Sequence, residues 1–192
     1  RRDPQLLDAI KRVAQREETV DEELSALAAE AELQGPAAAP TFLQISRTYE
    51  RLSRPEDALA ALLAARRVSP SDPLILSELA RIYEAQGRFD ELADVLLAWV
   101  QGNVDETEYV SINLRLAAIY EQQKRDLDAA GRYHAILARV SGHAGSLANL
   151  GKLYYRSQNW QGLLDTYEAE ANAADDAKQK AARLYKAGET LE

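Results

Sequence analysis

Four six-residue segments repeat one pattern, and their spacing decides the fold: ISRTYE at 45–50, LARIYE at 79–84, LAAIYE at 116–121 and LGKLYY at 150–155. Each segment opens with an apolar residue and a small one, and a tyrosine stands three positions after the small residue. The interval between consecutive tyrosines is nearly constant along the chain, and the middle interval is slightly longer than the other two. A period of about 34 residues is typical of architectures that stack one helical hairpin many times.

The alternation of shorter and longer intervals indicates a larger unit, made of two hairpins, that occurs twice. Residues 42–120 align with residues 113–191 without a gap, and Phe89 falls on Trp160. An ungapped match of this length indicates an internal duplication. Its register predicts that Trp160 is a core residue.

Within each hairpin, the periodicity predicts two helices. In the first one Phe42, Ile45 and Tyr49 recur at helical spacing, and Pro55 suits the first turn of a second helix. Pro70 ends that second helix, because proline cannot continue one. No segment alternates apolar and polar residues with a period of two, so we expect no strands.

These residue types resemble the tetratricopeptide repeat family, whose pattern runs from an apolar–small pair through a tyrosine to two alanines and a proline. Residues 39–72 fit it at Phe42, Ile45, Ser46, Tyr49, Ala58, Leu62, Ala65 and Pro70. Trp99 and Glu170 depart from it, because the family usually has alanine there. The resemblance implies an all-α, right-handed α-solenoid of antiparallel helix–turn–helix repeats. It also implies a protein-binding scaffold with no catalytic activity and no cofactor.

The same register divides the chain. Residues 1–38 are predicted to form a degenerate helical pair, in which Thr19 and Glu22 form a capping box at the start of the second helix. Four repeats follow over 39–177, at about 39–72, 73–109, 110–143 and 144–180. Residues 178–192 are the first helix of a further repeat or a capping helix. We expect a piece of a longer repeat protein that self-associates through its terminal repeats.

The composition excludes several functions. A net charge of −8 disfavours binding to nucleic acid and to anionic membrane surfaces. The chain has no cysteine, which excludes thiolate metal sites and is compatible with both cytoplasm and periplasm. No apolar run is long enough to insert into a membrane. His134 and His143 are too few for a metal site, and we assign both a surface or structural role.

The stretch GHAGSLANLGK at 142–152 ends in Gly-Lys, as a phosphate-binding loop does. Such a loop needs glycine at position 146 and a hydroxyl residue at 153, but the sequence has Ser146 and Leu153. We therefore interpret Gly151 as the small packing residue of a helix.

The resemblance also implies a binding groove, because the first helix of each tetratricopeptide repeat lines a concave face that receives peptides. Register places on it Arg47, Arg51, Arg81, Arg115, Asn149, Lys152, Tyr155 and Arg156, with Tyr185 and Lys186 further on. Cations outnumber anions there, so we expect an acidic or carboxylate-bearing partner segment. The open alternative is that these arginines pair with glutamates one turn away, as Arg81 could with Glu84.

The sequence therefore predicts a scaffold or adaptor that binds a protein or peptide partner. A regulatory or assembly module of a larger enzyme or membrane machine is the second interpretation. A helical-repeat RNA binder is the third, and the acidic net charge disfavours it. The partner, the pathway and the compartment do not follow from the residues.

Overall fold

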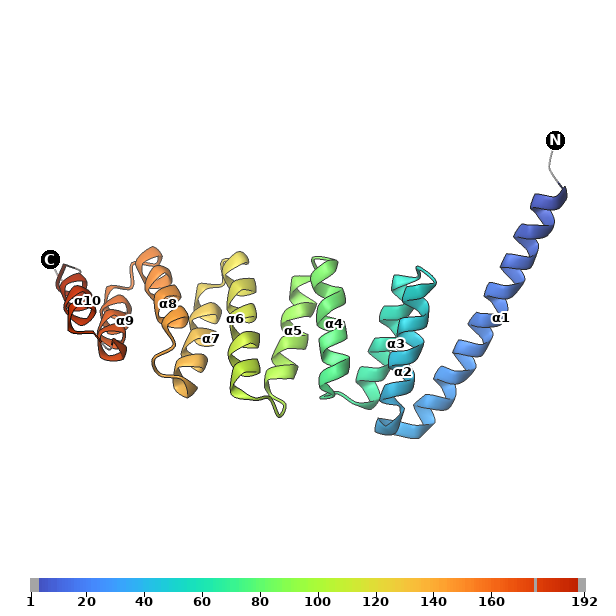
Figure 1. The fold of residues 1–192 in the computed structure, drawn as a ribbon, viewed down its shortest axis with the longest axis horizontal. Coiled ribbons are helices and arrows are strands. Elements are labelled where there is room, and N and C mark those ends of the chain that lie inside the picture. Colours follow the sequence, from blue (N-terminus) through green and yellow to red (C-terminus); the bar gives the residue numbers. More distant parts are fainter. Residues whose placement is uncertain (1–3, 175, 190–192) are drawn as a thin grey trace. The chain divides into compact units, whose positions relative to one another are not determined.

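The computed structural model describes residues 4–174 and 176–189, and within them the chain forms helices without a strand (Figure 1). The elements are α1 (Pro4–Gln34), the 3-10 helix η1 (Gly35–Ala38), α2 (Ala39–Arg51), α3 (Pro55–Val68), α4 (Pro73–Ala85), α5 (Phe89–Val100), α6 (Glu106–Gln122), α7 (Asp126–Arg139), α8 (Ala144–Arg156), α9 (Trp160–Ala173) and α10 (Ala177–Glu189). The predicted all-α helical repeat is confirmed. The chain divides into two compact units, Arg1–Arg88 and Phe89–Glu192.

The N-terminal segment differs from the predicted helical pair. It forms one continuous helix, α1, and Thr19 lies inside this helix instead of starting a second one. The reason is local, since no glycine or proline stands between Pro4 and Gly35 and most of the intervening residues favour helix. The helix ends at Gly35, whose φ of 63° is one that glycine adopts without strain.

Neighbouring helices pack through the positions that the repeat pattern marks. In the first unit α2 packs on α3 and α3 on α4, and in the second each helix from α5 to α10 packs on the next. The small residue of each segment is buried: Ser46, Ala80, Ala117 and Gly151. A methyl group added to Gly151 would lie 3.7 Å from Leu163 and Thr166, an ordinary contact. This position therefore needs a small residue, and alanine or serine serves as well as glycine.

The turn after each repeat tyrosine has the same geometry in all four repeats. One residue adopts a positive φ: Ser53 at 58°, Gly87 at 68°, Lys124 at 58° and Gln158 at 55°. The backbone N–H of the next residue donates to the tyrosine carbonyl oxygen at 2.8–2.9 Å. This pairing satisfies carbonyl groups that the helix end would leave without partners. It fixes the angle at which the second helix of the repeat begins.

An arginine follows the positive-φ residue in three of these turns and stacks on the tyrosine ring. The guanidinium carbon lies 5.0 Å from the ring centroid for Arg54 on Tyr49, 4.8 Å for Arg88 on Tyr83 and 4.5 Å for Arg125 on Tyr120.

The fourth turn replaces this arginine with Asn159, whose side-chain oxygen accepts the N–H of Gly162 at 3.0 Å. A Cβ on Gly162 would lie 2.8 Å from the Tyr154 ring, so glycine makes room for that ring. Trp160 lies beside this turn and is 49% exposed, so the predicted core position is wrong. Its ring instead meets the exposed ring of Tyr155 edge-on, with 5.9 Å between the centroids.

Candidate partner-binding surface

The predicted groove residues fall into two sets, one in each compact unit. Arg47 and Arg51 lie on α2 and Arg81 lies on α4, in the first unit. The second unit holds Arg115 on α6 and the remaining four on α8: Asn149, Lys152, Tyr155 and Arg156.

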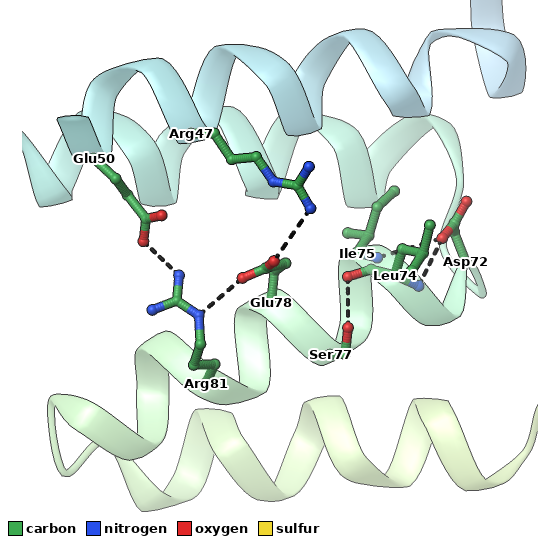
Figure 2. A network of polar contacts seen from close by, with 8 residues as sticks. All are labelled: Arg47, Glu50, Asp72, Leu74, Ile75, Ser77, Glu78 and Arg81. Atoms are coloured by element: carbon green, nitrogen blue, oxygen red, sulfur yellow. Dashed lines mark hydrogen bonds and ion pairs between the residues drawn. The ribbon is translucent and has the colours of Figure 1, made fainter. Parts of the chain in front are cut away.

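In the first unit, two of the three predicted cations on α2 and α4, Arg47 and Arg81, form a charge-balanced network with carboxylates (Figure 2). Arg81 lies between two carboxylates, with Nη2 2.5 Å from Glu50 Oε1 and Nε 2.9 Å from Glu78 Oε2. Arg47 Nη2 lies 3.6 Å from the other oxygen of Glu78. The hydrogen bonds to Glu50 and Glu78 raise the pKa of Arg81 above its ordinary value. Because two cations face two carboxylates, this network offers a partner little uncompensated charge.

In the second unit, helices α6, α7 and α8 build what we name the Glu121 cluster: Glu121, Asp126, Tyr133 and Arg156. The Tyr133 hydroxyl donates to Glu121 Oε1 at 2.6 Å. Arg156 lies 2.6 Å from Asp126 Oδ1 and 3.8 Å from Glu121 Oε2. Burial, together with the bond to Glu121, raises the pKa of the Tyr133 hydroxyl well above its ordinary value. Arg156 is thus already paired with two carboxylates of the same chain.

Helices α8, α9 and α10 line an open hollow of about 390 Å³, which we name the C-terminal groove. Its lining is Ala148, Gly151, Lys152, Tyr155, Tyr167, Glu170, Arg183 and Lys186. A second hollow of about 270 Å³ shares Ala148, Glu170 and Arg183 with it, so the two are adjacent. Of the eight predicted site residues, Lys152 and Tyr155 line the C-terminal groove.

The lining of the C-terminal groove is positively charged, with three cations and one carboxylate. The carboxylate, Glu170, is 12% exposed, and its Oε2 lies 3.1 Å from Nε of Arg183. Lys152 contacts a neutral group, the Asn149 Oδ1 atom at 3.4 Å. Tyr155 is 67% exposed and stands at the edge. The groove therefore combines positive charge with aromatic surface in a chain whose net charge is −8.

Three polar groove residues were absent from the predicted site: Tyr167, Glu170 and Arg183. Glu170 carried a signal, since a carboxylate stands there in place of the usual alanine of the pattern. Tyr167 takes the register position that Leu62 holds in the first repeat, and this position is typical of a packing residue. Arg183 carried no signal, because its role depends on where α10 packs against α9.

Both histidines make structural contacts. His143 precedes α8, and its Nδ1 accepts the backbone N–H of Ser146 at 3.1 Å. His134 Nε2 lies 2.6 Å from the Tyr154 hydroxyl oxygen. In residues 4–174 and 176–189, no group of three histidine or acidic side chains is placed to hold a metal ion. None of the described helices is long and apolar enough to cross a membrane.

Comparison with known proteins supports the repeat assignment. The tetratricopeptide repeat profile matches residues 75–101 and 146–182. A tetratricopeptide repeat protein from Parabacteroides merdae has a similar fold, with a TM-score of 0.52 and 19% identity over 80% of this chain and 60% of that one. The MamA protein is similar with a TM-score of 0.50 and 14% identity over 79% and 88%. The chain thus spans about 60% of the Parabacteroides protein, and no curated protein sequence matches it.

Proposed function

We propose that the chain is a protein-interaction scaffold whose C-terminal groove binds an acidic segment of a partner. The chain belongs to the tetratricopeptide repeat family, whose members stack helical hairpins into extended binding surfaces. The observation that carries this proposal is the groove lining, where Lys152, Arg183 and Lys186 face a single carboxylate, Glu170. The chain acts by binding, and its chemistry is that of charge-assisted hydrogen bonds to the partner.

The groove has the other properties of a peptide site. Its volume of about 390 Å³ accommodates several side chains. Tyr155 and Trp160 form an exposed aromatic edge, and such residues are enriched where binding energy is concentrated. Attraction by the groove must act at short range, because the rest of the chain is acidic and repels an acidic partner at a distance.

The first-unit residues make a smaller contribution in this proposal. Arg47 and Arg81 already share Glu78, and Arg81 also pairs with Glu50, so a partner carboxylate would have to displace these glutamates. Arg156 is engaged in the same way by Glu121 and Asp126. We therefore assign the main contact to Lys152 and Tyr155, with Arg51 and Asn149 as secondary candidates.

The test selects short capped peptides of random sequence on the immobilised chain and compares two variants. Lys152→Glu reverses a charge in the C-terminal groove. Lys180→Glu makes the same change on the exposed surface of α10, outside the lining.

Wild type and Lys180→Glu should enrich peptides rich in Asp and Glu, and Lys152→Glu should lose this preference. The proposal is wrong if no peptide class is enriched, or if Lys152→Glu selects the same peptides as wild type.

A further inference from the structure

The residue that follows each repeat tyrosine is a glutamate in three repeats and a tyrosine in the fourth. These residues are Glu50, Glu84, Glu121 and Tyr155. Glu50 and Glu121 both engage an arginine of a neighbouring helix, Arg81 and Arg156 respectively. The fourth repeat has therefore lost a carboxylate that the molecule uses internally elsewhere.

In the Glu121 cluster, the carboxylate that follows the repeat tyrosine also contacts a tyrosine of the second helix of the repeat. Tyr133 of α7 donates its hydroxyl to Glu121 at 2.6 Å. Arg156, from the next helix along, lies 3.8 Å from the other Glu121 oxygen. One carboxylate thus receives a phenol and a cation at the same time.

The next repeat supplies the donors without the acceptor. In its register, Tyr167 of α9 takes the position of Tyr133, and Tyr155 takes the position of Glu121. Both tyrosines line the C-terminal groove together with Lys152 and Lys186. Within the described part of the chain, the Tyr167 hydroxyl has no hydrogen-bond partner. The groove thus presents a phenol and cations where the preceding repeat also has a glutamate.

From this juxtaposition we propose that the C-terminal groove receives a glutamate side chain of a partner peptide, which occupies the place that Glu121 fills one repeat earlier. The Tyr167 hydroxyl donates to one carboxylate oxygen, and Lys152 neutralises the charge. This inference rests on the proposed function and specifies the group that is recognised.

The energetics favour a carboxylate over a neutral group at this place. Hydrogen bonds between a hydroxyl and a carboxylate are about twice as strong as neutral ones. Lys152 donates to the neutral Asn149 oxygen, so a carboxylate that approaches it need not break an existing ion pair. The one acidic side chain of the lining, Glu170, is paired with Arg183, which reduces its repulsion of the incoming group.

The experiment measures binding of the whole chain to three pools of short peptides with random neutral flanks. The first pool has a central Glu and capped ends, and the second has Gln in its place. The third has the Gln sequence and a free C-terminal carboxylate. The variant Tyr167→Phe removes only the groove hydroxyl, and the control variant Tyr109→Phe removes a hydroxyl from a tyrosine of α6, outside the lining.

We expect the Glu pool to bind in preference to the Gln pool, and Tyr167→Phe to weaken the Glu pool about tenfold. Tyr109→Phe should bind like wild type. Equal binding of the Glu and Gln pools, or a Tyr167→Phe variant that binds like wild type, would overturn the inference. The proposed function would then still stand on the Lys152→Glu result. Preference for the free C-terminus alone would overturn the assignment to a side chain, and failure of every pool to bind would overturn both proposals.

A second variant tests the same inference by supplying the carboxylate from the chain itself. Tyr155→Glu restores the glutamate of the other repeats and gives Tyr167 an internal acceptor. It should raise the thermal unfolding midpoint and weaken the Glu pool about tenfold or more. Tyr155→Gln loses the same ring without adding charge, and it should bind more tightly than Tyr155→Glu. Equal binding by these two variants would contradict the inference.

Discussion

The α6–α7–α8 and α8–α9–α10 triplets differ in where their charges are satisfied, although both are built from helices packed in succession. In the first triplet, Tyr133 and Arg156 meet carboxylates of the same chain. In the second, Tyr167 and Lys152 line a cavity whose one carboxylate, Glu170, pairs with Arg183. One repeating hairpin has thus produced a closed triplet, in which these groups are satisfied internally, and an open triplet, for which we propose a partner.

The largest effect should come from removing the carboxylate of the closed triplet. Glu121→Ala leaves the buried Tyr133 hydroxyl without its acceptor and removes one partner of Arg156, and we expect it to cost about 2–3 kcal/mol of unfolding free energy. Tyr155→Ala, the matched change in the open triplet, removes an exposed ring and should cost under about 1 kcal/mol. Urea denaturation measures both values, and equal losses would contradict the distinction between the triplets.

Removing the tyrosine hydroxyl should likewise cost more stability in the closed triplet, at Tyr133, than in the open triplet, at Tyr167. Tyr133→Phe should cost about 1–2 kcal/mol, because a buried hydroxyl bonded to a charged group is lost. Tyr167→Phe should stay within about 0.5 kcal/mol of wild type, because its hydroxyl bonds to no described residue. Chemical denaturation of both variants tests the pair, and a Tyr167→Phe loss as large as that of Tyr133→Phe would show that the groove hydroxyl is satisfied internally.

The stability of the closed triplet should also depend on alkaline pH, and this dependence can be measured without any partner. The pKa of Tyr133 is raised in the folded state, so its contribution to stability is fully present below the unfolded value of about 10 and is lost as the pH rises above it. Between about pH 9 and pH 11, wild type should lose more unfolding free energy than Tyr133→Phe. Parallel losses in the two proteins would argue that Glu121 does not control this hydroxyl.

The periodicity of the sequence predicted the helical repeats because buried small residues and tyrosines recur at fixed positions, from Ser46 to Tyr154. It failed at Thr19, where a capping signal lies within a run that has no helix breaker, and the uninterrupted run prevailed. It also failed at Trp160, which lies beside a turn where Asn159 replaces the arginine of the other repeats and Gly162 leaves room for the Tyr154 ring.

For the site, the register placed Lys152 and Tyr155 on one helix face, and both residues line the C-terminal groove. It could not show that Arg47 and Arg81 share their carboxylates, because Glu50 and Glu78 belong to different helices whose spacing depends on packing. Arg183 joined the groove for the same reason, through its contact with Glu170 on α9.

A smaller effect is expected in the turns that lead into the second helix of each triplet. Lys124 precedes α7 and Gln158 precedes α9, with φ values of 58° and 55° that disfavour any residue with a Cβ. Lys124→Gly and Gln158→Gly should each stabilise by about 1 kcal/mol. Gly87→Ala, at a φ of 68°, should destabilise by a similar amount. Unequal gains for Lys124→Gly and Gln158→Gly would indicate that the open triplet tolerates backbone strain differently from the closed one.

The smallest effect concerns the start of α8, the helix that both triplets share. His143 caps it through Nδ1, whereas Asp72, the residue that the duplication aligns with His143, caps α4 by accepting the N–H groups of Leu74 and Ile75. An aspartate at position 143 would keep the cap and add a negative charge at a helix N-terminus, so His143→Asp should stabilise by about 0.5 kcal/mol at neutral pH. Asp72→His should lose about as much, and calorimetry measures both.

Because the new charge lies at the far end of α8 from Lys152 and Tyr155, His143→Asp should leave peptide binding unchanged. A change in binding would mean that peptide affinity depends on the stability of the whole α8 helix, in addition to the residues that face the groove.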